Sequence, residues 1–176
     1  MNRFEFSLPA QMQFNNEDVV VTDPCYYIPD KIWHELIAAW YPPSDPNGTE
    51  YSEHGVIEFD NGAHVLYSST AYGDGEYPIY VNKSAGKSVH SDRLGVDAGM
   101  ISVVSVNDLK KLERDYGYTW DGKPFDLDKD YCPRVNGFTG RVYADGKGNF
   151  LGDIEVSTMS ETQSEDYNEE GYDEFH

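Results

Sequence analysis

The dipeptide Asn61-Gly62 constrains the fold of this chain more than any other short feature. It lies between two runs with the composition of strands, residues 55–60 and 63–68. Asn and Gly readily adopt the positive φ angles that a two-residue hairpin turn requires, so this dipeptide between two such runs is a strong hairpin signal. The sequence therefore predicts an antiparallel hairpin over residues 55–68.

Other short runs extend this β-rich pattern. Each is rich in β-branched or aromatic residues, or alternates apolar with polar side chains, as strands do. The runs span residues 4–8, 12–14, 18–22, 76–81, 94–96, 100–106, 137–144 and 148–156. Asp145-Gly146 separates the last two and predicts a second hairpin.

Two short helices are expected beside these strands. Apolar residues recur at helical spacing between Pro29 and Trp40, before a Pro-rich stretch that begins at Tyr41. Asn107 suits the N-cap of a second helix, which Gly117 is expected to end. The sequence thus predicts an α+β fold, with a single antiparallel β-rich domain and two short helices.

An acidic tail is expected to follow this domain. Residues 157–176 carry seven Asp and Glu, no Lys or Arg, and no periodic apolar residues. This composition predicts a globular domain over residues 1–156 and a disordered tail over residues 157–176. Acidic tails with spaced aromatic residues can dock on basic, partly apolar grooves, whereas the alternative is a purely solubilising tail. The candidate partner contacts are Glu165, Asp166, Tyr167, Glu169, Glu170 and Tyr172.

The net charge of −19 narrows the possible partners. The chain has 32 Asp and Glu against 13 Lys and Arg, without a basic cluster that matches a nucleic-acid footprint. Direct binding to nucleic acid or to an anionic membrane is therefore not expected. Such a surface favours basic proteins and cations, although the charge can also serve solubility alone. Because no apolar run approaches a membrane span or a secretory signal, a soluble, cytoplasmic protein is expected.

Three turns combine Asp with Gly or Pro next to a predicted strand. They are Asp23-Pro24-Cys25-Tyr26, Gly73-Asp74-Gly75-Glu76-Tyr77-Pro78 and Gly95-Val96-Asp97-Ala98-Gly99. If the turns meet at one end of the sheet, their carboxylates could bind Mg²⁺ or Ca²⁺, or act as an acid and base, and nearby tyrosines could line a ligand pocket. The alternative is that each Asp caps its own turn and that no cofactor is bound. The candidate ligand-binding residues are Asp23, Tyr26, Asp74, Tyr77 and Asp97.

Two cysteines, Cys25 and Cys132, lie far apart in the sequence and outside any CxxC pair. Free thiols in a reducing compartment are the expected state. Cys25 follows a proline at a strand end and could act as a nucleophile, but an unreactive buried thiol is the more common case. Whether Cys25 is reactive stays open at this point.

The same three turns resemble the motifs of an uncharacterised family of small bacterial and tailed-phage proteins. Its members show a DPCY segment, a GDGxYP segment and a GVDSG-like segment that is often followed by Gln. This chain has Ala98 at the usual Ser position and Met100 at the usual Gln position. The resemblance spans residues 18–105 and implies a shared fold without an established activity. By analogy, it favours a phage accessory protein inside a bacterial host cell.

These observations lead to hypotheses from different classes. The first is a non-enzymatic acidic binding protein, which acts as a phage-encoded inhibitor or modulator of a basic host protein, such as one that binds nucleic acid. The second is a small-ligand or nucleotide-binding protein, or a metal-dependent enzyme, that uses the clustered Asp turns. A third is a self-assembling structural component. We prefer the first because of the acidic charge, the acidic tail and the many aromatic residues, and because the sequence contains no complete catalytic signature.

Overall fold

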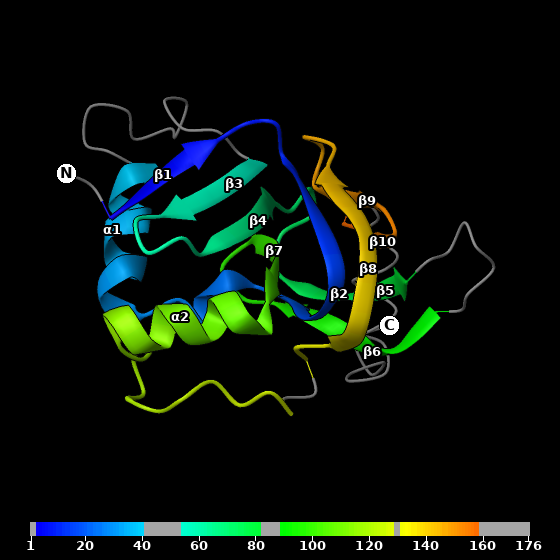
Figure 1. Ribbon diagram of the computed structural model, residues 1–176. Helices are drawn as coiled ribbons and strands as arrows, with labels where there is room; N and C mark the ends of the chain where they lie inside the picture. Colours follow the sequence, from blue (N-terminus) through cyan, green and yellow to red (C-terminus); the bar gives the residue numbers. More distant parts are fainter. Residues whose placement is uncertain (1–2, 41–53, 82–88, 129–130, 159–176) are drawn as a thin grey trace, which may run out of the picture.

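The computed structural model describes residues 3–40, 54–81, 89–128 and 131–158 (Figure 1). The strands are β1 (Phe4–Ser7), β2 (Gln11–Thr22), β3 (His54–Phe59), β4 (His64–Ser69), β5 (Gly75–Val81), β6 (Val89–Val96), β7 (Met100–Ser105), β8 (Arg134–Ala144), β9 (Asn149–Gly152) and β10 (Ile154–Ser157). The helices are the 3₁₀ turn η1 (Pro24–Tyr26), α1 (Asp30–Trp40) and α2 (Val106–Tyr116). None of the helices in these residues is long and apolar enough to span a membrane.

The strands form a single sheet in the order β1-β3-β4-β7-β2-β8-β9-β10-β5-β6. Every neighbouring pair in this sheet is antiparallel. The predicted α+β class, with a β-rich antiparallel sheet and two α-helices, is therefore confirmed.

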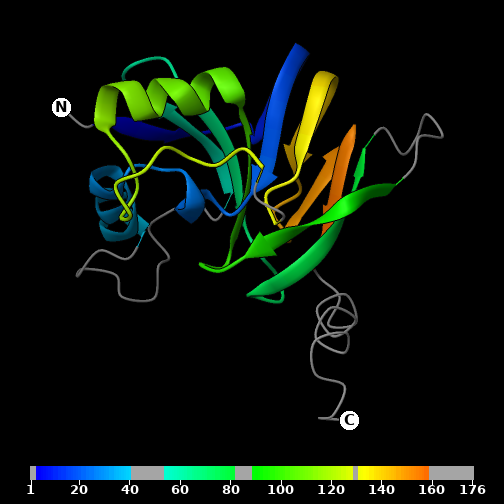
Figure 2. The same cartoon turned by 90° about the horizontal axis from the view of Figure 1, so that it is seen from below.

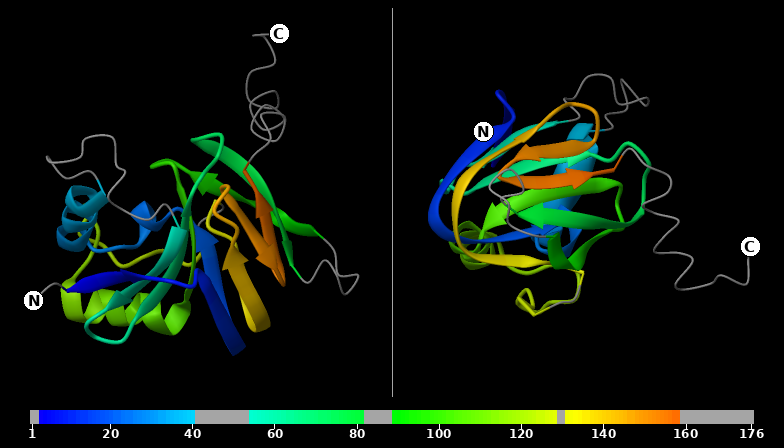
Figure 3. Two further views of the ribbon diagram at one scale, coloured as in Figure 1. Left: turned by 90° about the horizontal axis from the view of Figure 1, so that it is seen from above. Right: turned by 90° about the vertical axis from the view of Figure 1, so that its right-hand side faces the viewer.

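The sheet curls on itself, so that β5 and β6 at one end lie across from β2 in the middle (Figures 2 and 3). This curl produces two cores on opposite faces of the central strands. The helices cover the outer core, and the inner core lies within the curl. Successive strand residues point to opposite faces, so Val20 belongs to the outer core while Val19 and Val21 belong to the inner one. Burial on both faces is why residues 19–21 are an unbroken apolar run.

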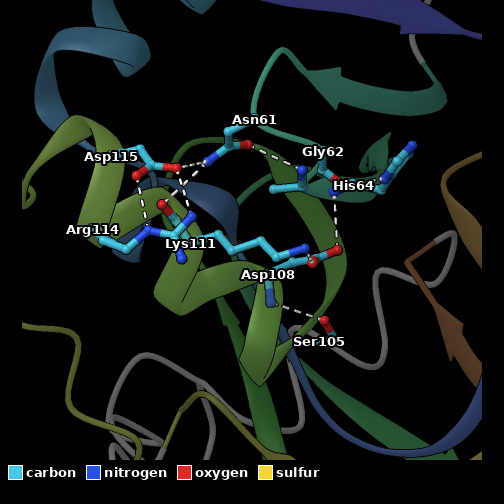
Figure 4. A network of polar contacts seen from close by, with 9 residues as sticks. Asn61, Gly62, His64, Ser105, Asp108, Lys111, Arg114 and Asp115 are labelled. Carbon is cyan, nitrogen blue, oxygen red and sulfur yellow. Dashed lines mark hydrogen bonds and ion pairs between the residues drawn. The ribbon is translucent and has the colours of Figure 1, made fainter.

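The hairpin predicted at Asn61-Gly62 is confirmed, and it joins β3 to β4. Of these two residues, only Gly62 has a positive φ, of 91°. The side chain of Asn61 holds the turn instead, because its Oδ1 accepts a hydrogen bond from the N–H of Ala63 at 3.0 Å. Its Nδ2 donates to the carboxylate of Asp115 at 2.9 Å and to the carbonyl of Lys111 at 3.2 Å (Figure 4). Asn61 therefore links the hairpin to α2.

Helix α2 begins earlier than predicted, and its N-cap is Ser105 instead of Asn107. The Ser105 hydroxyl accepts a hydrogen bond from the N–H of Asp108 at 3.0 Å (Figure 4). The Asp108 carboxylate in turn accepts a hydrogen bond from the N–H of His64 at 3.1 Å. Ser105 is also the last residue of β7, so the chain passes from strand to helix without a loop. Gly117, with a φ of 96°, ends α2 as predicted.

Several strand predictions are wrong in detail. The strand expected over residues 94–96 begins at Val89, as β6, and the strand expected over residues 137–144 begins at Arg134, as β8. Residues 12–14 and 18–22 were expected as separate strands but belong to the twelve-residue β2, which is bulged around Asn16 (φ 51°). Residues 148–156 were expected as one strand but divide into β9 and β10. Gly152 has a φ of 101°, and a Cβ at this position would lie 2.4 Å from the carbonyl oxygen of Arg141. The turn between β9 and β10 therefore requires glycine at this position.

The folded part extends beyond the predicted boundary at residue 156. β10 ends at Ser157, and Thr158 is fully buried. The N–H of Thr158 donates to Oδ1 of Asn149 at 3.0 Å, and its hydroxyl accepts from the N–H of Ala71 at 3.0 Å. The tail residues that we named as candidate partner contacts, 165–172, lie outside the described residues.

Candidate functional site

Asp23 determines the local conformation of the first Asp turn. It lies at the end of β2 and is the N-cap of η1, in which Pro24 takes the first position. One carboxylate oxygen, Oδ1, accepts a hydrogen bond from the N–H of Cys25 at 2.9 Å. Asp before Pro is well suited to this position, since the Asp side chain bonds the backbone two residues on and Pro presets a helical φ.

The same carboxylate joins the first turn to the third. Oδ2 of Asp23 accepts hydrogen bonds from the N–H groups of Asp97 at 3.0 Å and Ala98 at 2.6 Å. Asp23 is fully buried, and burial raises its pKa although these amide hydrogen bonds oppose the rise. Asp23 therefore connects two segments that are more than 70 residues apart in the sequence.

The second turn reaches the same place through Thr70. The N–H of Thr70 donates to the carbonyl of Gly99 at 3.0 Å, and its hydroxyl donates to the carbonyl of Gly73 at 3.0 Å. Oδ1 of Asp74 lies 3.9 Å from the position that a Cβ on Gly99 would occupy. The structure thus brings the three Asp turns together, and we name residues 23–26, 73–75 and 97–99 the junction.

The predicted site residues have different environments within the junction. Asp74 and Asp97 are exposed, whereas Asp23 and Tyr77 are fully buried. The Tyr77 hydroxyl donates to the carbonyl of Gly73 at 2.8 Å, and burial raises the pKa of Tyr77 to about 12. Asp23 and Tyr77 therefore hold the turns in place, and only Asp74 and Asp97 present their carboxylates to solvent.

A network of buried polar side chains lies next to the junction. The Tyr27 hydroxyl and the Ser102 hydroxyl are 2.8 Å apart, and Ser102 donates to the carbonyl of Thr22 at 2.7 Å. The Thr22 hydroxyl lies 3.0 Å from Sγ of Cys132. Burial raises the pKa of Tyr27 well above its usual range, so its hydroxyl stays protonated in the folded protein even at mildly alkaline pH.

Cys25 is partly buried beside two carboxylates. Its thiol donates a hydrogen bond to the Asp23 carboxylate. Burial, followed by the nearby charges of Asp23 and Asp97, raises the pKa of Cys25 far above its usual range. Because the thiolate is the reactive form, this setting is opposite to that of a nucleophilic cysteine.

The arrangement offers a cation fewer ligands than three carboxylates suggest. Both oxygens of Asp23 already accept hydrogen bonds from backbone amides. Within the ranges that the structure describes, no three His, Cys, Asp or Glu side chains are grouped as metal ligands. Binding of Mg²⁺ or Ca²⁺ at the turns stays a prediction.

A pocket of about 260 Å³ opens beside the junction. We name it the junction pocket. It lies between η1, the start of α1, the turn at Asp97 and the segment that follows α2. The N–H of Asp30 donates to the carbonyl of Tyr118 at 3.0 Å, which fixes that last segment against α1. The lining residues are Cys25, Tyr26, Ile28, Asp30, Trp33, Asp97, Ala98, Thr119 and Trp120.

No family model, curated protein or solved structure matches this chain. The resemblance to the uncharacterised family of bacterial and phage proteins therefore stays a prediction, as does the activity of the junction.

The sequence did not point to several residues of the junction pocket. Asp30 and Trp33 were assigned only to a helix, and Trp120 fell in a segment without a periodic pattern. Trp120 is 83% exposed. The only available signal was the position of this large aromatic residue shortly after Gly117, which ends α2.

Proposed function

We propose that this chain is a non-enzymatic binding protein that engages a basic partner protein through its acidic surface. The resemblance to phage proteins favours a role as an inhibitor or modulator of a bacterial host protein in the cytoplasm. The proposal rests on the charge imbalance of the folded domain. Without the tail, residues 1–156 still carry 25 Asp and Glu against 13 Lys and Arg, a net charge of −12.

Some of the basic side chains among the described residues already pair with acidic neighbours. Arg3 pairs with Glu35 at 3.9 Å, Lys111 with Asp108 at 3.6 Å, and Arg134 with Asp18 at 3.2 Å. Even if every Lys and Arg of residues 1–156 paired with one carboxylate, twelve acidic side chains would remain without a basic partner. A surface of one sign attracts partners of the opposite sign and accelerates their association.

The roles of the buried junction residues support binding over catalysis. Asp23 bonds three backbone amides, the Tyr77 hydroxyl bonds a carbonyl, and Cys25 is held as a thiol. Each of these three groups therefore has a structural use, and none is placed as a free acid, base or nucleophile. A nucleotide is the weaker alternative ligand, because its phosphates would approach Asp97 and Asp30 in the junction pocket.

The test is capture of partners from bacterial lysate with the full chain and with a chain that ends at Thr158, at low and high salt. Residues 159–176 carry all seven acidic residues of the tail, so the shorter chain has a net charge of −12. We expect a basic protein in stoichiometric amount at low salt and its loss at high salt, since exposed charges are screened. Capture that is insensitive to salt, or no captured basic protein, would contradict the proposal.

A further inference from the structure

We infer that the junction pocket receives the guanidinium group of an arginine side chain from the partner. This inference rests on the proposed function and names the group that the acidic surface binds most specifically. It follows from the carboxylates, the aromatic rings and the size of this one pocket.

The Asp97 carboxylate is available to a cation. Its backbone N–H bonds Asp23, which fixes the position of the residue, while its side chain is exposed. Within the part of the chain that the structure describes, the Asp97 side chain has no hydrogen-bond or ion-pair partner. The second carboxylate in the pocket, that of Asp30, lies 3.5 Å from Nε2 of His34. No Lys or Arg is among the described residues that line the pocket.

Aromatic rings complete the recognition surface. Trp120 is 83% exposed, and it lines the pocket together with Trp33 and Tyr26. The ring of Tyr26 is held in place by Tyr131, whose centroid is 4.8 Å away. An exposed tryptophan beside the carboxylate of Asp97 is a favourable place for a cation, because cations bind the faces of aromatic rings and Trp binds them best. Interface residues that dominate binding energies are also enriched in Trp.

The size of the pocket favours a side chain over a whole small molecule. Its volume of about 260 Å³ is below the roughly 300–1,000 Å³ of common small-molecule sites. Arginine suits the lining better than lysine does. Its planar guanidinium can stack on a tryptophan while its edge donates to carboxylates, and it is less strongly hydrated than an ammonium group.

A defined peptide tests the inference without knowledge of the partner. The full, ¹⁵N-labelled chain is titrated with a capped Gly-Ser peptide that contains one arginine, and binding is followed by NMR. We expect saturable shifts of the backbone amides of Asp97 and Ala98 and of the indole N–H of Trp120. The same peptide with citrulline, which is isosteric and neutral, should give no saturable shift, and the lysine peptide should bind several-fold more weakly. Equal shifts with citrulline, or no saturable shift with arginine, would overturn the inference.

Variants distinguish binding in the junction pocket from attraction by the overall negative charge. Trp120→Ala and Asp97→Asn should each weaken binding of the arginine peptide by about two- to fivefold, the size expected for one exposed cation–π contact or charge pair. Glu5→Gln removes the same charge from an exposed position on β1 and should change binding by less than about twofold. Both pocket side chains are exposed, so the melting temperature should stay unchanged. Equal affinity of Asp97→Asn and Glu5→Gln would overturn the inference.

Capture with the same variants distinguishes the two proposals. If Trp120→Ala and Asp97→Asn retain a salt-sensitive basic partner as well as the unmodified chain does, the proposed function stands and the pocket inference fails. If no basic protein is captured but the arginine peptide still binds in the pocket, the pocket binds a guanidinium group and the proposed function as a binder of a basic protein is wrong.

Discussion

At the residue scale, one buried carboxylate organises the junction. Asp23 accepts three backbone hydrogen bonds, one within its own turn and two from the turn at Asp97 and Ala98. The sequence offered two interpretations of this residue, a turn cap or a ligand-binding group. Asp23 does cap its own turn, and it also joins a distant one. Asp23 is fully buried, so its carboxylate does not face solvent.

Asp23→Ala should lower the free energy of unfolding by about 3 kcal/mol, because three amide N–H groups lose their acceptor. Chemical denaturation measures the change. Asp74→Ala is the matched control, since its exposed carboxylate has no hydrogen-bond partner among the described residues, and it should change stability by less than about 0.5 kcal/mol. Equal effects of the two variants would contradict the role of Asp23.

The raised pKa of Tyr77 predicts a loss of stability at alkaline pH. Its folded pKa is raised from 10.0 to about 12, so its contribution is present below pH 10 and is lost as pH rises towards 12. In that window the unfolded chain has released the proton that the folded chain retains, and one such group lowers the free energy of unfolding by about 1.4 kcal/mol per pH unit. Denaturation at several pH values should show a slope shallower by about this amount in Tyr77→Phe. An unchanged slope would contradict the assignment.

At the scale of elements, caps and turns decide how strands and helices join. The β3–β4 hairpin and α2 were both predicted, but the contacts between them were not. Asn61 and His64 bond Asp115 and Asp108 of α2 (Figure 4). Such contacts join residues from separate parts of the chain, and the periodicity of either element does not encode them.

The N-cap of α2 gives a direct test at this scale. Ser105→Ala should lower stability by about 1 kcal/mol, because the N–H of Asp108 loses its acceptor. Asn107→Ala should change stability by less than about 0.5 kcal/mol, since Asn107 is exposed and lies inside the helix. Thermal unfolding of both variants measures the difference. A larger effect of Asn107→Ala would restore the cap predicted from the sequence.

At the scale of the whole molecule, the curl of the sheet brings β5 and β6 across from the central strand β2 and encloses the inner core. Thr158 belongs to this closure, because it contacts Asn149 at the start of β9 and Ala71 just after β4. It also donates a hydrogen bond to the carbonyl of Gly148. Thr158 is therefore bonded both to the nearby start of β9 and to a segment 87 residues away in the sequence.

Truncation should reveal this closure. A chain that ends at Thr158 should unfold with the same free energy as the full chain. A chain that ends at Val156 should be less stable by about 2–3 kcal/mol, since several buried polar groups lose their partners. Chemical denaturation of both chains compares them, and equal stability would show that Thr158 does not close the domain.

The β-rich α+β class, the Asn-Gly hairpin, the two helices and the three Asp turns were predictable from the sequence, because they depend on local conformational preferences and on short periodic patterns. Other features follow from the folded arrangement: the three turns meet, Asp23 and Tyr77 are buried while Asp97 is exposed, and Trp120 lines a pocket with Asp30. The reason is physical. Burial and long-range hydrogen bonds depend on which distant strands pair, and many pairings are compatible with the same short patterns.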